Sequence, residues 1–306
     1  MIISASRRTD LPACYSDWLV KRFQEGFVLV RNPFRFHQIS RISLSPEVVD
    51  GVVFWTKNPL PLIPKLDAFQ EYAYYFLFTL NSYDRSLEPG IPPKKEVLIS
   101  AFKRLSDQIG PDRVIWRYDP IIISESYSIA YHLENFERIA HELSGYTHQC
   151  IISFLDFYRD TGKNLAAFHL HPFSDESQRI LANNLGKIAR SNRLELCACA
   201  ENMDLSAFQI QPSHCIDSQL LSKLAGYPVL AEKDKNQRKE CDCAASIDIG
   251  TYNTCRIGCR YCYAVHPGNR RFLTDQTHDS NAPLLFGEVS AQDIITDRSV
   301  RSCRIG

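Results

Sequence analysis

The 306-residue sequence has no excess of charge of either sign and no long hydrophobic run. Its 35 Lys and Arg residues balance 35 Asp and Glu residues. Proteins that bind polyanions over a large surface carry a basic excess, so zero net charge argues against that class and leaves only a local basic groove. The longest apolar run, residues 72–80, is far too short to span a bilayer. We therefore expect no association with a membrane.

The N-terminal residues also lack the apolar core of a signal peptide. The sequence therefore predicts a cytoplasmic protein, in which thiols stay reduced. Against that background one residue type is abundant, because there are eleven cysteines and nine of them lie between Cys197 and Cys303. In a reducing compartment, clustered cysteines more often bind metal or carry out redox chemistry than form disulfides.

Up to about residue 200, short apolar runs alternate with longer amphipathic stretches. The runs that predict buried strands are residues 2–6, 51–56, 74–80, 114–117, 150–155 and 194–199. The stretches that predict helices are residues 16–26, 94–109, 126–143 and 175–190. This alternation is typical of an α/β fold, and we expect residues 1–220 to form a partial or closed (β/α) barrel of about six to seven parallel strands. Residues 221–306 are expected to form a cysteine-rich segment and tail that complete the barrel.

Polar residues follow the predicted strands. In a parallel barrel the carboxyl ends of all strands lie on one face, where such enzymes keep their chemistry. The residues that we single out at these ends are Arg7, Arg8, Asp10, Lys57, Asn58, Arg117 and Asp119. The cations among them predict a pocket for a carboxylate or a phosphate. The alternative is that these residues are only N-caps and turns, positions that Asp and Asn favour in any protein.

The most specific pattern is the stretch TCRIGCRYCY at residues 254–263. It spaces Cys255, Cys259 and Cys262 as C-x3-C-x2-C. Three thiolates on one loop can bind three irons of a four-iron cluster and leave the fourth iron open for chemistry. Zinc is the alternative, with His266 as a fourth ligand. A purely electron-carrying cluster is the third interpretation, which the lack of a further cysteine before Cys303 disfavours.

This loop resembles the signature of the radical S-adenosylmethionine (SAM) superfamily, including an aromatic residue before the third cysteine, here Tyr261. The resemblance implies a 4Fe-4S cluster and SAM as cofactors. It implies reductive cleavage of SAM to a 5′-deoxyadenosyl radical that acts on an unidentified substrate. It further implies a reductant such as flavodoxin or ferredoxin, and a Tyr261 that packs near the adenine.

Two features depart from the superfamily pattern. The three-cysteine loop usually follows the first barrel strand, whereas here it follows six predicted strands. Residues 247–252 resemble the strand that feeds the loop, and pairing of that strand with residues 2–6 would restore the order in space, as in a circular permutation. The Gly-Gly-Glu motif that holds the amino group of SAM is absent, and by position Asp10 would take its place.

The wider chain resembles DUF1848, a bacterial family described as a domain of unknown function. The stretches that carry this resemblance are SASRRTD at residues 4–10, FWTKNP at residues 54–59 and the segment 248–264. The match extends over nearly the whole chain. Because that family is defined by sequence, the resemblance brings no activity with it.

A second set of cysteines lies between residues 197 and 243. We expect a closed site of four thiolates from Cys199, Cys215, Cys241 and Cys243, which would bind either a second iron–sulfur cluster or zinc. Cys197 shares a strand face with Cys199 and is the other candidate on that strand. The alternative is that the strand cysteines are small buried apolar residues.

The substrate class stays open between a small molecule and nucleic acid. A nucleic-acid lesion is one option, because spore photoproduct lyase belongs to the radical SAM superfamily. The non-enzyme alternative is a barrel held together by zinc or an iron–sulfur cluster, which acts as a binding or electron-transfer protein.

Overall fold

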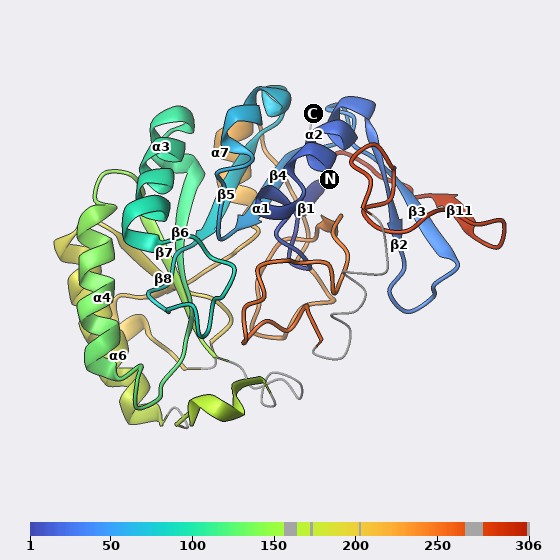
Figure 1. Cartoon of the computed structure of the whole chain (residues 1–306). Coiled ribbons are helices and arrows are strands. Elements are labelled where there is room, and N and C mark those ends of the chain that lie inside the picture. Colours follow the sequence, from blue (N-terminus) through green and yellow to red (C-terminus); the bar gives the residue numbers. More distant parts are fainter. Residues whose placement is uncertain (156–163, 172–173, 202, 267–277, 305–306) are drawn as a thin grey trace.

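The computed structural model describes residues 1–155, 164–171, 174–201, 203–266 and 278–304, and its centre is a sheet of eight parallel strands (Figure 1). The strands in spatial order are β10 (Ile247–Asp248), β1 (Ile2–Ala5), β4 (Gly51–Thr56), β5 (Tyr74–Thr79), β6 (Val114–Ile121), β7 (Gln149–Phe154), β8 (Glu195–Ala198) and β9 (Gln211–Pro212). All six strands predicted from the apolar runs are confirmed. Within the described residues β9 and β10 are the two edges and do not pair with each other, so the sheet is open and closure into a barrel is not shown.

The first strand of the chain pairs with a strand from its last quarter. Ile3 pairs with Ile247 and Ser4 with Asp248 in the parallel register of β1 and β10. Beyond these strands the two backbones stay close, because a Cβ atom added to Gly250 would lie 2.1 Å from the Ser6 Oγ. The predicted adjacency of the segments 247–252 and 2–6 is therefore confirmed, although the regular strand ends at Asp248.

Helices flank the central sheet (Figure 1). The α-helices are α1 (Leu11–Cys14), α2 (Ser16–Glu25), α3 (Ile99–Ile109), α4 (Ile129–Glu142), α6 (Asp175–Ser191) and α7 (Ser218–Ala225). Short 3-10 turns are η1 (Ile63–Phe69), η3 (Pro111–Arg113), η4 (Ala166–Phe168) and η5 (Ser206–Phe208), and η2 (Lys94–Leu98) is a π-helical turn that leads into α3. Side-chain caps fix several starts: Ser128 and Ser174 accept from the backbone N–H groups of Tyr131 and Ser177. The four predicted helices are confirmed.

A small second sheet was not predicted. It consists of β2 (Phe27–Arg31) and β3 (Gln38–Ser43), which form an antiparallel hairpin, and β11 (Ile294–Asp297), which lies parallel to β3. In Figure 1 these strands project to the right of the central sheet. The predicted C-terminal segment 221–306 thus supplies one strand, β10 or β11, to each sheet.

The core is built mainly from large apolar side chains of the central strands and of the helices that cover them. Trp18 of α2, Phe54 of β4, Phe102 of α3 and Trp116 of β6 are completely buried. Aromatic rings stack directly across the layers, as Phe78 of β5 does on Phe102 with ring centres 5.0 Å apart. None of the described helices is both long enough and apolar enough to cross a membrane.

Candidate functional site

Residues that follow neighbouring strands contact one another at the carboxyl edge of the central sheet. An Asp10 carboxylate oxygen accepts from the backbone N–H of Lys57 at 2.7 Å, which joins the ends of β1 and β4. The Asn81 side chain, after β5, donates to the Asp119 carbonyl in β6 at 2.8 Å. The Ser153 hydroxyl in β7 donates to the Asp119 carboxylate at 2.6 Å. One polar layer therefore runs across β1, β4, β5, β6 and β7.

The same layer continues to β10 through Asp248. Its carboxylate accepts hydrogen bonds from the hydroxyls of Ser4 at 3.0 Å and Ser6 at 2.6 Å and from the backbone N–H of Arg7 at 2.8 Å. The Arg8 guanidinium lies 3.9 Å from the same carboxylate. Asp248 is thus the side chain that ties β10 to β1, a role that the sequence motif gave no means of assigning.

Asp10 is a buried helix cap. One carboxylate oxygen accepts from the Ala13 N–H at 3.0 Å and the other from the Lys57 N–H. Burial, followed by the charge of Cys255, raises the pKa of Asp10 to about 7. The N-cap interpretation of this residue is therefore confirmed, and its contact with the amino group of SAM stays a prediction.

The three-cysteine loop is fixed by backbone hydrogen bonds to the segment after β5. The Arg260 N–H donates to the Leu87 carbonyl at 2.9 Å, and the Gly90 N–H donates to the Ile257 carbonyl at 2.9 Å. Gly90 is required for this approach, because a Cβ at that position would lie 2.5 Å from the Ile257 oxygen. Gly258, in the middle of the loop, adopts a left-handed backbone with φ of 75°.

The thiols of this loop differ in their surroundings. A hydrogen bond with the Cys14 thiol lowers the pKa of Cys255 to about 6. Burial raises the pKa of Cys262 to about 11 and raises that of Cys259 well above its usual range. The sequence gave Cys14 no partner, because the helix that carries it lies some 240 residues before the loop. The pairing of β1 with β10 and a hydrogen bond between the Tyr15 hydroxyl and the Thr254 carbonyl bring the two segments together.

Within the described ranges, no three or more His, Cys, Asp or Glu side chains are arranged to hold a metal ion. A four-iron cluster does not require such convergence, because each cysteine binds a different iron atom. The chemistry of the donor set fits that group: Cys255, Cys259 and Cys262 are three partly buried thiols on one short loop at the carboxyl edge of the sheet. His266, the fourth ligand of the zinc alternative, is exposed.

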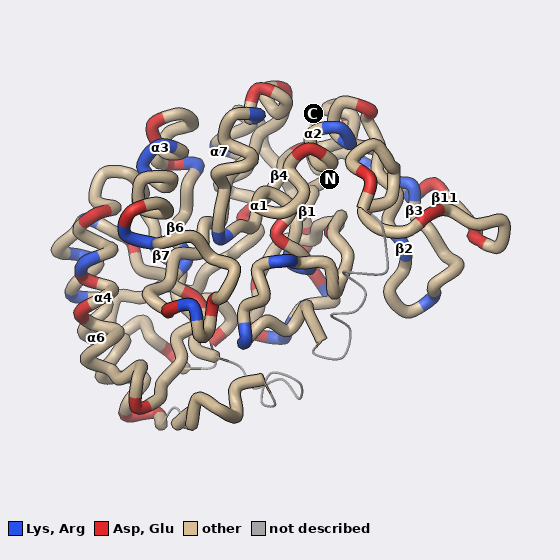
Figure 2. The backbone as a smooth tube through the Cα atoms, in the orientation of Figure 1, with Lys and Arg blue, Asp and Glu red and all other residues tan. Residues whose placement is uncertain are grey.

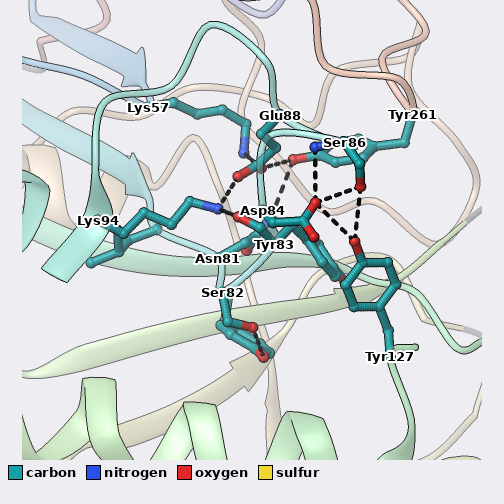
Figure 3. A network of polar contacts seen from close by, with 12 residues as sticks. Lys57, Asn81, Ser82, Tyr83, Asp84, Ser86, Glu88, Lys94, Tyr127 and Tyr261 are labelled. Carbon is teal, nitrogen blue, oxygen red and sulfur yellow. Dashed lines mark hydrogen bonds and ion pairs between the residues drawn. The ribbon is translucent and has the colours of Figure 1, made fainter.

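A buried carboxylate that the sequence did not single out lies beside the loop (Figure 3). Glu88 accepts hydrogen bonds from the ammonium groups of Lys57, at 2.9 Å, and Lys94, and from the Tyr261 hydroxyl. The Asn81 amide donates to the same hydroxyl at 3.3 Å. Although burial opposes ionisation, the two lysine charges lower the pKa of Glu88 to about 2. The Lys57 ammonium also lies 5.3 Å from the centre of the Tyr261 ring.

The cations predicted to form an anion pocket are paired with side chains of the protein. Arg117 forms an ion pair with Asp119, and its guanidinium lies 5.0 Å from the Trp55 ring centre. Arg7 lies 5.7 Å from the same ring and 3.6 Å from the Asp234 carboxylate. Arg117 and Trp55 each keep one buried nitrogen, Nε and Nε1, without a hydrogen-bond partner among the described residues.

Asn58 serves the turn after β4. Its side-chain oxygen accepts from the Leu60 N–H at 3.3 Å, and its own N–H donates to the Thr56 hydroxyl at 3.0 Å. The turn interpretation accounts for this residue, and contact with a cofactor stays a prediction.

The four cysteines of the second set lie together. The Cys199 and Cys215 sulfurs are 3.2 Å apart, Cys215 also hydrogen-bonds Cys243, and Cys243 hydrogen-bonds Cys241. All four are buried. Hydrogen bonds from Cys215 and Cys241 hold the pKa of Cys243 at about 2. Cys197 accepts instead from the Gln149 amide at 3.3 Å, so Cys199 is the strand cysteine that joins the set.

Comparison with known proteins gives a family and no activity. No curated protein matches the chain. Among solved structures, a protein of Bacteroides thetaiotaomicron VPI-5482 assigned as an alpha-L-fucosidase aligns over 85% of this chain and 87% of its own, with 13% identity and a TM-score of 0.26. A family described as a domain of unknown function matches residues 2–264. The chain therefore belongs to that family, DUF1848.

Proposed function

We propose that the protein is a radical SAM-like iron–sulfur enzyme. The observation that carries the proposal is the parallel pairing of β10 with β1, because it puts the C-x3-C-x2-C loop directly after a strand at the carboxyl edge of the sheet. That edge is where parallel α/β enzymes bind their ligands. In the superfamily the three-cysteine loop usually follows the first strand of the barrel. Here the loop comes late in the sequence, but the strand before it lies beside the first strand, which is compatible with that arrangement.

In this proposal Cys255, Cys259 and Cys262 bind a 4Fe-4S cluster. Such a cluster, once reduced by one electron, would supply the reductive cleavage of bound SAM to methionine and a 5′-deoxyadenosyl radical, the species that would take a hydrogen atom from the substrate. The chain supports this chemistry by holding the loop against residues 87–90 and by keeping its thiols partly shielded from water. A reductant such as flavodoxin or ferredoxin would donate the electron.

Among the proposed cofactor-binding residues, Tyr261 and Lys57 are held in place by a shared partner, the Glu88 carboxylate. Glu88 holds the Tyr261 hydroxyl and the Lys57 ammonium at once, so the ring and the cation keep a fixed position beside Cys259. A fixed positive charge at that point stabilises a bound anionic cluster or a carboxylate. Arg7, Arg8, Arg117, Asn58, Asp119 and Asp10 remain the other proposed contacts of SAM.

The test is anaerobic reconstitution with iron and sulfide, followed by dithionite and SAM. We expect a brown protein that forms methionine and 5′-deoxyadenosine. Cys259→Ala should abolish 5′-deoxyadenosine, whereas Cys303→Ser, which changes a partly buried cysteine outside both sets, should leave it unchanged. A wild-type protein that binds zinc at this loop and no iron would refute the proposal and favour a zinc-stapled binding protein.

The second candidate function is an iron–sulfur electron carrier, which would bind iron at the same loop and leave SAM intact under dithionite. For the substrate we propose a small molecule in preference to duplex nucleic acid. Lys and Arg residues are interleaved with Asp and Glu along the backbone (Figure 2), and a duplex binder needs a basic face that neutralises several phosphates. Substrate turnover that requires a DNA or RNA lesion would overturn this choice.

A further inference from the structure

The second set of cysteines, Cys199, Cys215, Cys241 and Cys243, shares no residue with the three-cysteine loop of the proposed function. Its four members come from three segments: the end of β8, the turn before α7, and the C-x-C pair at residues 241–243. Each is at most 8% exposed, and the set lies in an apolar cluster with Ile2, Val53 and Leu77. The four thiols are not arranged to hold a metal ion as they stand, but thiols from distant segments that come together in an apolar cluster are a soft donor set of the kind that binds one.

We propose that Cys199, Cys215, Cys241 and Cys243 bind one Zn²⁺ ion in a closed structural site. The contacts favour a single ion over a cuboidal four-iron cluster, because the Cys199 and Cys215 sulfurs already lie 3.2 Å apart. Around tetrahedral zinc with bonds of about 2.3 Å, neighbouring sulfurs lie about 3.8 Å apart, so this pair needs to separate by only about half an ångström. A cuboidal cluster would bind each sulfur to a different iron and hold the four further apart.

In the described structure the four thiols form a hydrogen-bonded chain and not a tetrahedron. Cys199 contacts Cys215, Cys215 contacts Cys243, and Cys243 contacts Cys241. Zinc binding therefore requires loss of the thiol protons and rotation of the cysteine side chains.

The surrounding charge fits this assignment. Zinc bound by four thiolates carries a net charge of about −2, and such a charge in a buried site needs cations nearby. The Arg117 guanidinium interacts electrostatically with Cys199 and Cys215, and the Arg7 guanidinium with Cys243. The Arg117 Nε is buried and has no hydrogen-bond partner among the described residues, so it is available to donate to a thiolate.

Zinc in this site would cross-link β8, the turn before α7 and the segment that leads into β10. The Cys243 carbonyl accepts from the Asp234 N–H, and the Ala244 N–H donates to the Ile216 carbonyl, so the backbone of the C-x-C pair is already anchored on both sides. Zinc at this point would fix the start of the segment that carries the permuted strand.

The experiment measures metal content in the full chain, purified with thiol reductant from zinc-supplemented cells. To exclude iron at the first loop, it uses the triple variant Cys255→Ala, Cys259→Ala, Cys262→Ala as the background. We expect about one zinc per chain and an X-ray absorption shell of four sulfurs at about 2.3 Å. Cys215→Ser should lose the zinc, whereas Cys197→Ala, a buried cysteine of the same strand face as Cys199, should retain it.

A second measurement does not depend on whether Cys215→Ser and Cys197→Ala fold. A mercurial that caps thiols should release the zinc from the background protein, detected with a chromogenic chelator, and Co²⁺ exchanged into the site should give the intense visible absorption of tetrahedral thiolate coordination. Absence of zinc, iron with sulfide in its place, or a disulfide between Cys199 and Cys215 in reduced protein would each overturn the proposal. Wild-type protein that retains this zinc but forms no 5′-deoxyadenosine after reconstitution would refute the proposed function alone.

Discussion

Glu88→Gln is the substitution with the clearest expected effect on stability. The wild-type carboxylate is 2% exposed and neutralises two lysines, Lys57 and Lys94. Gln has nearly the same shape but no charge, so the change leaves the two partly buried ammonium groups of Lys57 and Lys94 without their shared counter-ion. Removing one partner of a buried ion pair costs about 3–5 kcal/mol.

The pKa of Glu88 gives a second route to the same magnitude. Folding lowers that pKa from 4.5 to about 2. Each pKa unit is worth about 1.4 kcal/mol, so the ionised carboxylate stabilises the folded state by roughly 3 kcal/mol at neutral pH. Because the folded-state pKa is the lower one, this contribution is complete above pH 4.5 and is lost as the pH falls from 4.5 towards 2.

The assay is urea unfolding followed by tryptophan fluorescence, at pH 7 and at steps down to pH 3. We expect Glu88→Gln to lower the free energy of unfolding at pH 7 by roughly 3 kcal/mol and to remove the corresponding part of the acid-induced loss. Glu96→Gln, on the exposed surface of η2, is the matched control and should change little. Equal stability of Glu88→Gln and Glu96→Gln at pH 7 would refute the reasoning.

Three further predictions concern His132, Gly90 and Asp50. Burial lowers the pKa of His132 from 6.5 to about 4, so the free energy of unfolding of the wild type should fall by up to roughly 3 kcal/mol as the pH drops from 6.5 to 4. His132→Gln should abolish this pH dependence. An unchanged dependence of the unfolding free energy on pH in the variant would contradict the prediction. Gly90→Ala puts a Cβ 2.5 Å from the Ile257 oxygen and should reduce iron bound after reconstitution while circular dichroism stays native; full iron loading would argue against the contact. Asp50→Asn leaves the buried Met1 ammonium without its counter-ion and should lower the free energy of unfolding by about 3 kcal/mol. Urea unfolding at pH 7 measures this loss, and equal stability of the variant and the wild type would disprove the prediction.

The central sheet was predictable from sequence because strands of a parallel sheet are buried on both faces and therefore read as continuous apolar runs. The run YYFLFT of β5 is an example, with five of its six residues buried. The hairpin of β2 and β3 escaped prediction because only Ile39 and Ile42 of β3 are buried, three residues apart, which is neither a continuous apolar run nor an alternation. In addition, β3 gains its second partner, β11, only from the distant tail. A half-buried strand of this kind carries a weak pattern.

The cysteines were predictable in kind and spacing, but their neighbours were not. Glu88 lies in a polar loop whose sequence is typical of an exposed turn, and nothing in it indicates that two lysines and Tyr261 converge there. Cys14 likewise gains its partner Cys255 only through the tertiary fold. Contacts set by the crossing of separate loops leave no periodic signal in a single sequence.

The pairing of β1 with β10 also has a consequence for how the chain is made. Ser4 and Asp248, which hydrogen-bond across this pair, are separated by 244 residues. Contacts of such long range are slow to form, since closing the intervening loop costs entropy before the contact is gained. During synthesis β1 can pair with β4 on one side, but its other side stays an open edge until residue 248 has left the ribosome. The three-cysteine loop is therefore added to a nearly finished sheet, so assembly of the cluster that we propose for it would belong to the last stage of maturation.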